Sequence, residues 1–299
     1  MRETWLAPAK INLWLRITGR RPDGYHTLDT CYQAIDLYDT VTLEPLGPDA
    51  GEPPVACAVQ GEMASGVPAD EGNLAVRAAR LLAAHTGHEL NLSLTITKAI
   101  PAGAGLGGGS SDAAAVLLAL ARRFAVPDPE HTLRELALEL GADVPFFLEG
   151  GTQIAGGVGE RLSAVPPPPE RWGILAYPGV SVSSAWAYRA FDEFPANLVE
   201  RERSPDDCRE RGNDLESIIF DRHSEMRRAH AILASGQAIV VRMSGSGSAI
   251  FALYASAAPR DNDLPRVRER LRDLPDAWVW PFACIDHGVR PLPDRPQTI

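Results

Sequence analysis

Alternation of apolar and polar residues predicts strands in both halves of the chain. Between residues 11 and 17 every second residue is a large apolar one, and this period of two is typical of a half-buried strand. The turn sequence Pro22-Asp23-Gly24 follows soon after, because proline and glycine favour tight reversals of the chain. Alternation or a short apolar run predicts further strands at residues 27–36, 40–44, 55–59, 90–97, 172–177, 239–243, 249–254 and 278–284.

Helical periods and end signals predict helices between these strands. Asn73 is a capping residue in front of one apolar face, and Gly87 stops that helix. Pro129 suits the first position of the next helix, and Gly141 ends it. Further helices are expected at residues 113–124, 185–191, 214–220, 224–234 and 262–273.

The stretch from Lys98 to Phe124 organises the rest of the chain. It joins the strand at 90–97 to the helix at 113–124 through a loop with five glycines. Glycine lets the backbone adopt positive φ and approach a ligand closely, and the first N–H groups of a helix lack internal partners. Several such N–H groups together bind phosphate, so the loop predicts a phosphate cradle. Its glycines are Gly103, Gly105, Gly107, Gly108 and Gly109.

Three other interpretations of this loop are weaker. A P-loop needs a lysine directly after the glycines, and none stands there. Gly103, Gly105 and Gly108 satisfy the dinucleotide pattern G-x-G-x-x-G. The acidic residue that this pattern needs about 20 residues further on would be Asp128, which lies in a proline-flanked loop. A merely flexible loop is the third interpretation, and its position between two ordered elements argues against it.

Composition narrows the class of protein. The 299 residues suffice for one large domain or two ordinary ones, and 45% hydrophobic residues can form a full core. A net charge of −10 argues against a nucleic-acid surface or an anionic-membrane surface, although a nucleotide needs only a local basic pocket. Four separated cysteines are typical of reduced thiols. The N-terminus has no signal-peptide pattern and no apolar run is long enough to span a bilayer, so we expect a cytoplasmic protein.

Four consecutive prolines, Pro166–Pro169, form a stiff linker. We therefore expect an N-terminal domain at residues 1–165 and a C-terminal domain at residues 166–299. The segment 46–54 is rich in glycine and proline and favours a loop. The segment 200–212 is highly charged and favours a solvated linker, and the proline-rich tail from Pro291 is expected to be loose.

Three further segments carry candidate chemistry, and each has a plainer interpretation. Lys10 and Asn12 share one face of the first strand, where a lysine more often faces solvent. Asp143 stands between a helix end and an apolar run, which suits a half-buried functional carboxylate or a simple loop cap. Residues 244–248, Ser-Gly-Ser-Gly-Ser, suit an ordinary hairpin or a close approach of backbone to a ligand.

Taken together, these segments resemble the three signature motifs of the GHMP kinases. The motifs are PAKINLWLRITGRRPDGYHTL, PAGAGLGGGSSDAA and RMSGSGSAIF, in that order. The resemblance extends over residues 7–254 and implies an α+β fold of two domains with the active site in the interdomain cleft. Its N-terminal domain would bind the nucleotide and carry the catalytic residues.

The resemblance also implies the roles of individual residues. Asp143 would take the proton from the acceptor hydroxyl, and Lys10 would stabilise that carboxylate, the alkoxide and the migrating phosphoryl group. ATP would supply the phosphoryl group, and Mg²⁺ would bridge its phosphates with help from Ser110 or Ser111. The phosphates would lie against the glycine loop, whose residues are Pro101, Ala102, Gly103, Ala104, Gly105, Leu106, Gly107, Gly108, Gly109, Ser110 and Ser111.

The Gly-Tyr-His end of the first motif, with LGADVPFF and GNDLE, is similar to one member of this family in particular. That member phosphorylates the 2-hydroxyl of a cytidyl-erythritol in the non-mevalonate isoprenoid pathway. The likeness implies that Tyr25 stacks on the cytosine, that His26 hydrogen-bonds to it and that Asn12 contacts the substrate. Tyr188 or Trp186 would cover the opposite face of the base.

Two alternatives stay open at this point. Another GHMP small-molecule kinase, acting on homoserine, mevalonate or a sugar, would share the glycine loop but not the pair Tyr25 and His26. A nucleotide-binding module without catalysis would also share the loop, but the presence of both Lys10 and Asp143 argues against it. The sequence is compatible with a monomer or a homodimer, and it predicts no nucleic-acid or membrane partner.

Overall fold

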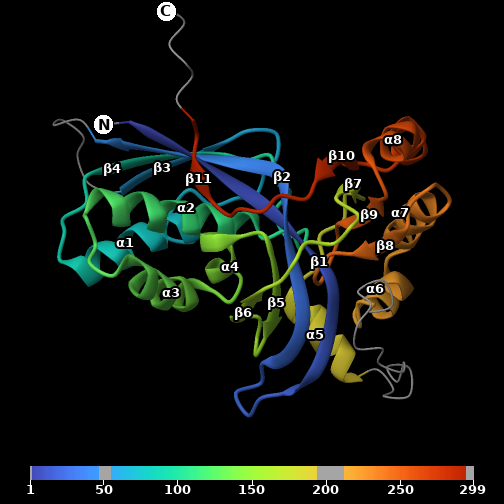
Figure 1. Ribbon diagram of the computed structural model, residues 1–299, viewed down its shortest axis with the longest axis horizontal. Coiled ribbons are helices and arrows are strands. Elements are labelled where there is room, and N and C mark those ends of the chain that lie inside the picture. The colour runs from blue at the N-terminus through green and yellow to red at the C-terminus, as the bar shows by residue number, and fades with distance from the viewer. Residues whose placement is uncertain (1, 47–54, 194–211, 294–299) are drawn as a thin grey trace, which may run out of the picture.

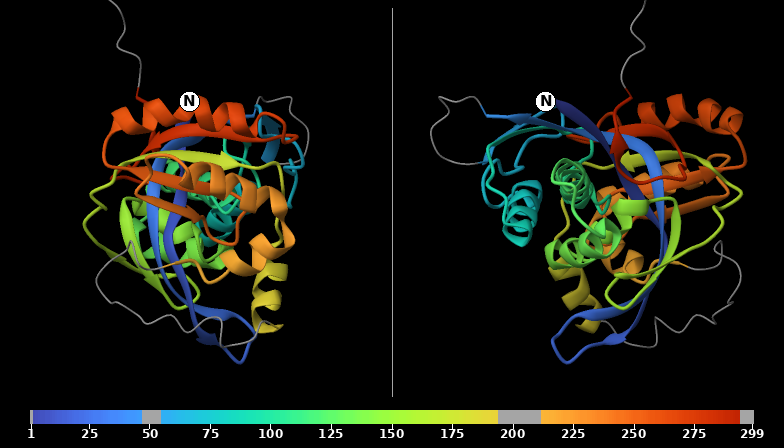
Figure 2. Two further views of the ribbon diagram at one scale, coloured as in Figure 1. Left: turned by 90° about the vertical axis from the view of Figure 1, so that its right-hand side faces the viewer. Right: turned by 60° about the vertical axis from the view of Figure 1, so that its left-hand side comes forward.

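Two β-sheets, each with helices on one face, make up the described part of the chain (Figures 1 and 2). The computed structural model describes residues 2–46, 55–193 and 212–293. The loop expected at 46–54 and the linker expected at 200–212 therefore lie outside the described residues, except at one end of each.

A long antiparallel hairpin runs through the molecule (Figure 1). Its strands, β1 (Glu3–Arg20) and β2 (His26–Pro45), pair over nearly their whole length and meet at the expected turn. The strands expected at 27–36 and 40–44 are therefore parts of the single strand β2. Three register shifts bend the pair, because an extra residue in one strand of a ladder locally increases its twist. The bent hairpin reaches both sheets.

The first sheet is built on this hairpin. Its strand order is β11-β1-β2-β4-β3, and β5 and β6 extend it beside β2. β3 and β4 are parallel and are joined through a helix, as parallel neighbours require. Its other strands are β3 (Val55–Gln60), β4 (Leu92–Thr97), β5 (Thr152–Gly156), β6 (Arg161–Ala164) and β11 (Arg290–Pro291).

The helices of the first half cover one face of that sheet. Two of them have the ends that the sequence predicts. The side chain of Asn73 accepts a hydrogen bond from the N–H of Ala75 at 2.9 Å, and Gly87 ends the same helix in the left-handed conformation. Pro129 begins the helix that Gly141 ends. The helices are α1 (Leu74–Thr86), α2 (Gly108–Arg123), α3 (Pro129–Leu140) and α4 (Val144–Glu149).

The second sheet is antiparallel, with strand order β10-β7-β9-β8. The periodicity predicts all four strands to within a residue or two of their ends. They are β7 (Trp172–Tyr177), β8 (Val240–Met243), β9 (Ile250–Tyr254) and β10 (Trp278–Ala283). The helices of this half are α5 (Ser184–Glu193), α6 (Glu216–Arg222), α7 (Ser224–Ala234) and α8 (Ala257–Leu271).

Two helices begin five residues earlier than predicted, and one short helix was not predicted. α2 begins at Gly108 and not at residue 113, because contacts of the glycine turn with the rest of the fold outweigh the low helix propensity of glycine. The apolar run after Asp143 forms the short helix α4, which periodicity did not predict. α8 begins five residues earlier than expected and contains Pro265; Pro259 is compatible with the first turn, where a missing N–H costs nothing.

The end of the described chain is not loose. Arg290 and Pro291 pair with β1, and the N–H of Leu292 donates to the carbonyl of Thr4 at 2.8 Å. The expectation of a loose tail from Pro291 was therefore wrong for its first residues, because the open edge of β1 supplies partners that a local sequence pattern cannot show. Residues 294–299 lie outside the described residues.

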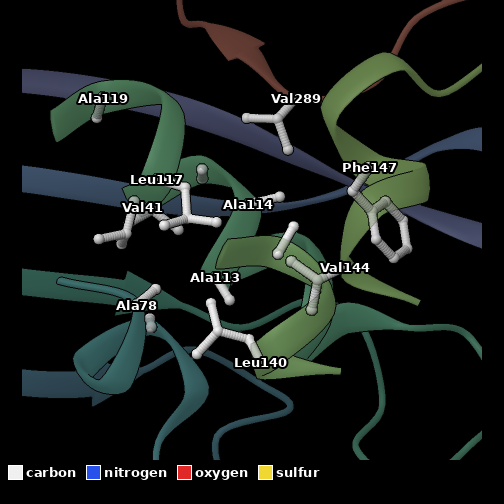
Figure 3. Close-up of a cluster of buried hydrophobic side chains, with 14 of the residues drawn as sticks. Val41, Ala78, Ala113, Ala114, Leu117, Ala119, Leu140, Val144, Phe147 and Val289 are labelled. Carbon is white, nitrogen blue, oxygen red and sulfur yellow. The ribbon is translucent and has the colours of Figure 1, made fainter. Parts of the chain in front are cut away.

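Three hydrophobic cores hold the layers together. One packs the first sheet against α1 to α4, and Figure 3 shows its centre, with Ala113, Leu117, Leu140 and Val144 on neighbouring helices. A second packs the other sheet against α6, α7 and α8. The third lies between the two sheets and includes Leu106 of the glycine loop. The loop is therefore anchored in a core and is not a flexible connection.

Candidate active site

Lys10 is buried, although a lysine on a strand more often faces solvent. Only 4% of the surface of Lys10 is exposed. Its ammonium donates to Oδ1 of Asn12 at 2.6 Å and lies 5.0 Å from the ring centre of Tyr32. The two residues share a face of β1, as the alternation predicts, and Asn12 is fixed in turn by a bond from Nδ2 to the hydroxyl of Thr30. A buried charge needs partners, so this lysine requires an anion beside it.

Asp143 supplies that anion. Its Oδ2 lies 3.6 Å from the ammonium of Lys10, and its Oδ1 accepts a hydrogen bond from the hydroxyl of Tyr32 at 3.1 Å. Asp143 occupies the residue before α4 but makes no capping bond with its side chain, which decides against the simple cap. Burial and the charge of Asp143 raise the pKa of Tyr32 well above its ordinary value. Tyr32 therefore stays a neutral phenol that donates to the carboxylate.

The glycine loop lies directly against this pair. The N–H of Lys10 donates to the carbonyl of Leu106 at 2.9 Å. Gly107 has φ +72, and a Cβ there would lie 2.6 Å from the ring of Phe147 and 3.3 Å from Cγ of Lys10. Gly105 has φ +75, and a Cβ there would lie 2.3 Å from the carbonyl oxygen of Ser244. Only glycine fits these positions. The glycine loop can therefore pack directly against Lys10 and against Ser244.

The turn at 244–248 is a part of the site and not a free hairpin. The hydroxyl of Ser244 donates to the carbonyl of Gly105 at 3.0 Å and accepts from the N–H of Asn12 at 3.2 Å. The side-chain amide of Asn213 donates to the carbonyl of Gly245 at 2.7 Å. Asn213 belongs to the GNDLE segment, and this bond ties that segment to the turn. The turn connects the second sheet to the glycine loop.

A buried charge cluster supports the loop from below. The ammonium of Lys98 donates to Oδ2 of Asp112 at 2.6 Å and to Asp39, and all three residues are buried. Asp39 also accepts from the backbone N–H groups of Ala99 and Ile100. No local pattern in the sequence indicates this cluster, because its members come from β2, the end of β4 and the start of α2. Two carboxylates share one ammonium, so the cluster would have a net charge of −1 if both carboxylates were ionised.

That excess charge affects the proton equilibrium of Asp112. Burial and the neighbouring charge of Asp39 raise its pKa to about 7, against the pull of Lys98. Within the part of the chain that the structure describes, Oδ1 of Asp112 has no hydrogen-bond partner, which suits a carboxyl that keeps its proton. Burial also raises the pKa of Asp39, and Lys98 and two backbone N–H groups oppose that change.

We expect this cluster to make the protein less stable as pH rises from 4 to 7. In the unfolded chain Asp112 loses its proton near pH 4, whereas the folded protein retains it to about pH 7. Across that interval the folded state binds more protons, so the free energy of unfolding falls with rising pH. Urea unfolding of the protein and of Asp112→Asn at four pH values from 4.5 to 7.5 measures the effect. A difference between the two that does not vary with pH would contradict it.

A first cavity of about 340 Å³ opens over the glycine loop. Of the residues predicted for the nucleotide, it is lined by Pro101 to Ser110, while Ser111 is buried behind them. It is also lined by Val67, Pro68 and Asn73, and by Lys98. No motif marks the segment before α1, and the parallel crossover from β3 to β4 brings it to the loop.

A second cavity of about 470 Å³ lies at the tip of the hairpin. It is lined by Tyr25, His26 and Tyr188, and Tyr25 is 66% exposed. Tyr188 stacks on His26 with ring centres 5.1 Å apart, whereas Trp186 packs edge-on against His223. Tyr188, not Trp186, therefore lines this cavity together with Tyr25 and His26. Burial raises the pKa of Tyr188, and the charge of Asp143 raises it further.

Lys10 and Asp143 line neither cavity, but each lies near a residue that lines one of them. Lys10 reaches the first through Gly107, which lines it. The charge of Asp143 acts on Tyr188, which lines the second. An ammonium beside a carboxylate, near a phosphate cradle and near an aromatic cavity, can move a phosphoryl group between two ligands. This geometry favours phosphoryl transfer, because phosphoryl transfer needs positioning and charge neutralisation above all.

No ready-made metal centre is present in the described residues, where no three His, Cys, Asp or Glu side chains gather around one point. A hydroxyl is available, since Oγ of the buried Ser111 has no hydrogen-bond partner within the same residues. Ser110 lines the first cavity. These two groups suit Mg²⁺ that arrives with a nucleotide, because Mg²⁺ commonly takes one or two protein ligands plus phosphate oxygens.

The fold and the site define the class of the GHMP kinases. The model described as "GHMP kinases N terminal domain" matches residues 73–151, and "GHMP kinases C terminal" matches residues 202–274. The two-domain α+β fold expected from the motifs is confirmed, since solved GHMP kinases share it. A homoserine kinase from Cytophaga hutchinsonii matches 97% of each chain with a TM-score of 0.70 at 18% identity.

Relatives with higher sequence identity show which family of GHMP kinases the chain belongs to. The curated 4-diphosphocytidyl-2-C-methyl-D-erythritol kinase of Prosthecochloris aestuarii is 39% identical over 89% of this chain and 92% of its own. A crystal structure of 4-(cytidine 5'-diphospho)-2C-methyl-D-erythritol kinase is 34% identical, with a TM-score of 0.70 over 95% of this chain and 99% of its own. The chain belongs to the 4-diphosphocytidyl-2-C-methyl-D-erythritol kinase family of GHMP kinases.

Proposed function

We propose that this protein transfers the γ-phosphoryl group of ATP to the 2-hydroxyl of 4-diphosphocytidyl-2-C-methyl-D-erythritol, a step of the non-mevalonate isoprenoid pathway. Family membership supports the reaction. The observation that carries it to this chain is the contact of Lys10 with Asp143, near residues that line a glycine-loop cavity and near Tyr188, which lines a second cavity with Tyr25 and His26. The first cavity would bind ATP and the second would bind the cytidyl end of the acceptor.

The carboxylate and the ammonium do the chemistry. Asp143 accepts the proton of the 2-hydroxyl as its oxygen attacks the γ-phosphorus, and the bond from the γ-phosphorus to the bridging oxygen of ADP breaks. The nearby Lys10 keeps the carboxylate ionised and stabilises charge on the attacking oxygen and the transferring group. The hydroxyl of Tyr32 holds the carboxylate in place from its other oxygen. Asn12 positions the ammonium.

The glycine loop holds the nucleotide phosphates. α2 begins at Gly108, so its first N–H groups face the cavity that Pro101 to Ser110 line. Four N–H groups at a helix start lack internal partners, and they donate to anions. The buried cluster of Asp39, Lys98 and Asp112 fixes the helix start against the sheet. Ser110 or Ser111 would contact Mg²⁺, which when bound offsets the negative charge of the phosphates.

The second cavity takes the cytidine end of the substrate. Tyr25 contributes an exposed ring to its lining, and Tyr188, stacked on His26, contributes a second ring. Stacking of a base on an aromatic ring contributes about 1–3 kcal/mol. His26 supplies the hydrogen bond that a base edge requires, and it lines the same cavity beside Tyr188.

A coupled assay of ADP release tests this function. The cytidyl-erythritol, homoserine, mevalonate and a set of sugars are each supplied with ATP and Mg²⁺. ADP release that requires the cytidyl-erythritol supports the proposal, and release with another acceptor replaces it by a second GHMP kinase activity. ATP binding without ADP release from any acceptor would favour a binding module.

Substitution of Tyr25 by alanine should raise KM for the cytidyl-erythritol by about tenfold to a hundredfold, the equivalent of one stacking contact. KM for ATP should stay unchanged, because Tyr25 does not line the nucleotide cavity. Steady-state kinetics with each substrate varied in turn give both values. Trp280→Ala is the matched control, since Trp280 is an exposed aromatic residue on β10. Equal KM values in Tyr25→Ala and the unaltered protein would favour an acceptor without cytosine.

We also propose a cytoplasmic location, and a monomer or homodimer as the assembly. No helix among the described residues has the length and apolarity that crossing a membrane requires. The acidic net charge of −10 suits a protein without a nucleic-acid partner. The division into domains at residues 165 and 166 stays a prediction. Sedimentation of the purified protein distinguishes the two assemblies.

A further inference from the structure

The carboxylate of Asp192 holds the imidazole of His26 at the edge of the second cavity. Oδ1 of Asp192 lies 2.7 Å from Nε2 of His26, and Oδ2 lies 3.1 Å from the guanidinium of Arg20. Asp192 stands in the last turn of α5, far along the chain from the hairpin. Figures 1 and 2 both show α5 beside the hairpin tip. Asp192 was not among the predicted site residues, because no motif marks it.

The ring of His26 is held in one orientation. Its side chain is 8% exposed, Tyr188 stacks on one face at 5.1 Å between ring centres, and Phe191 meets it edge-on at 6.3 Å. In the described part of the chain no hydrogen-bond partner faces the other nitrogen, Nδ1. The ring lines the second cavity, so Nδ1 is the nitrogen that remains for a ligand.

The carboxylate also decides which nitrogen carries the proton. In a neutral imidazole one nitrogen donates and the other accepts, and the hydrogen bond of one nitrogen sets the state of the other. An ionised carboxylate can only accept. Nε2 therefore donates to Asp192, and Nδ1 is left as an acceptor. Without Asp192 neither form would be imposed.

We propose that Asp192 is a positioning residue that fixes His26 as a hydrogen-bond acceptor and so makes the second cavity prefer a base with an exocyclic amino group. Cytosine carries such a donor at position 4, where uracil carries a keto oxygen. A keto oxygen opposite Nδ1 places two acceptors together and leaves both unpaired, which is costly in a buried site. The inference rests on the proposed function for its choice of base; Asp192 also lines the second cavity, and its proposed role acts through His26.

Nitrogen NMR of the free protein tests the proton position without any substrate. The protein is labelled with ¹⁵N-histidine and measured at pH 8.5, where a free imidazole is neutral. The signal of His26 is assigned by its loss in His26→Gln. We expect the form protonated at Nε2 in the unaltered protein and a mixture of both forms in Asp192→Ala. A proton on Nδ1 in the unaltered protein, or no change in the variant, would overturn the inference.

Binding of CDP and UDP tests the consequence. Calorimetry should show tighter binding of CDP, and Asp192→Ala should reduce the ratio of the two dissociation constants about fivefold, the worth of one ordinary hydrogen bond. Asp192→Glu should restore part of the ratio. Arg20→Ala is the matched control, because Arg20 also lines the cavity and pairs with Asp192, while its loss leaves the bond of Asp192 to His26 and should weaken CDP and UDP alike. An unchanged ratio in Asp192→Ala, or an equal loss in Arg20→Ala, would contradict the proposed role.

The two tests also separate this inference from the proposed function. If the protein releases no ADP with the cytidyl-erythritol while Asp192 still controls the proton position and the CDP preference, the function fails and the inference stands. If the protein turns over the cytidyl-erythritol and Asp192→Ala alters neither property, the inference fails and the function stands.

Discussion

Asp143→Asn should lower kcat about 10²-fold to 10⁴-fold, the usual cost of a lost general base. The amide has the shape of the carboxylate but cannot take a proton from the 2-hydroxyl. Its loss also leaves Lys10 without its anion at 3.6 Å. KM for both substrates should change little, because the residue lines neither cavity. ADP release under saturating substrate measures kcat directly.

The fold should survive this substitution. The side chain of Asp143 is 35% exposed, and it makes no capping bond to α4. The melting temperature is expected to fall by several degrees, because the buried Lys10 loses its anion but keeps its hydrogen bond to Asn12. Asp261→Asn is the matched control, since Asp261 is an exposed residue on α8. If Asp143→Asn retained a kcat within threefold of the unaltered enzyme, another group would have to be the base.

Lys98→Met should destabilise the protein by about 3–5 kcal/mol, the cost of leaving a buried charge without its partner. The ammonium contacts both Asp39 and Asp112, and all three side chains are at most 3% exposed. Burial opposes the charge of Lys98, but the two carboxylates outweigh it and raise its pKa. Methionine fills a similar volume and offers neither carboxylate a proton or a hydrogen bond. Urea unfolding at pH 8 measures the loss.

Two further variants test whether the loss in Lys98→Met comes from leaving buried carboxylates without a cation. Arg134→Met removes the cation of the exposed pair with Glu149, and surface pairs contribute only about 0–1 kcal/mol. The double variant Lys98→Met with Asp112→Asn should recover part of the loss, because one of the two unpaired carboxylates is gone. A Lys98→Met protein within 1 kcal/mol of the unaltered one, roughly the exposed-pair limit, would show that the cluster does not stabilise the fold.

Local signals predict most elements of this fold. Asn73 and Gly87 locate α1 because a cap and a left-handed stop act on the helix itself. Alternation predicts every long strand, since a buried face repeats every second residue. The six residues of α4 were missed because they complete fewer than two helical turns. The start of α2 was misplaced because contacts of Gly105 and Gly107 outside the helix determine it.

The residues of the candidate site also fall into two groups: those that local motifs predict and those that only the folded structure reveals. Lys10 and Asp143 belong to motifs, and the structure brings their charges together as expected. Tyr32 was missed because a tyrosine on a strand resembles any core residue. Asp192 and the cluster beneath the loop were missed for a different reason. Their partners lie more than 50 positions away along the chain, except for the pair of Lys98 and Asp112, which are 14 apart, and no pattern in a single sequence links such positions.

The sequence contains only two lysines, and both are buried at this site. Lys10 is 4% exposed and Lys98 is 3% exposed, while arginine provides all the other permanently cationic side chains. Isotopic labelling of lysine alone would therefore give a spectrum of two side-chain ammonium signals. One would report on the reacting groups and the other on the support of the nucleotide loop. Each binding event could then be followed at both places in a single sample.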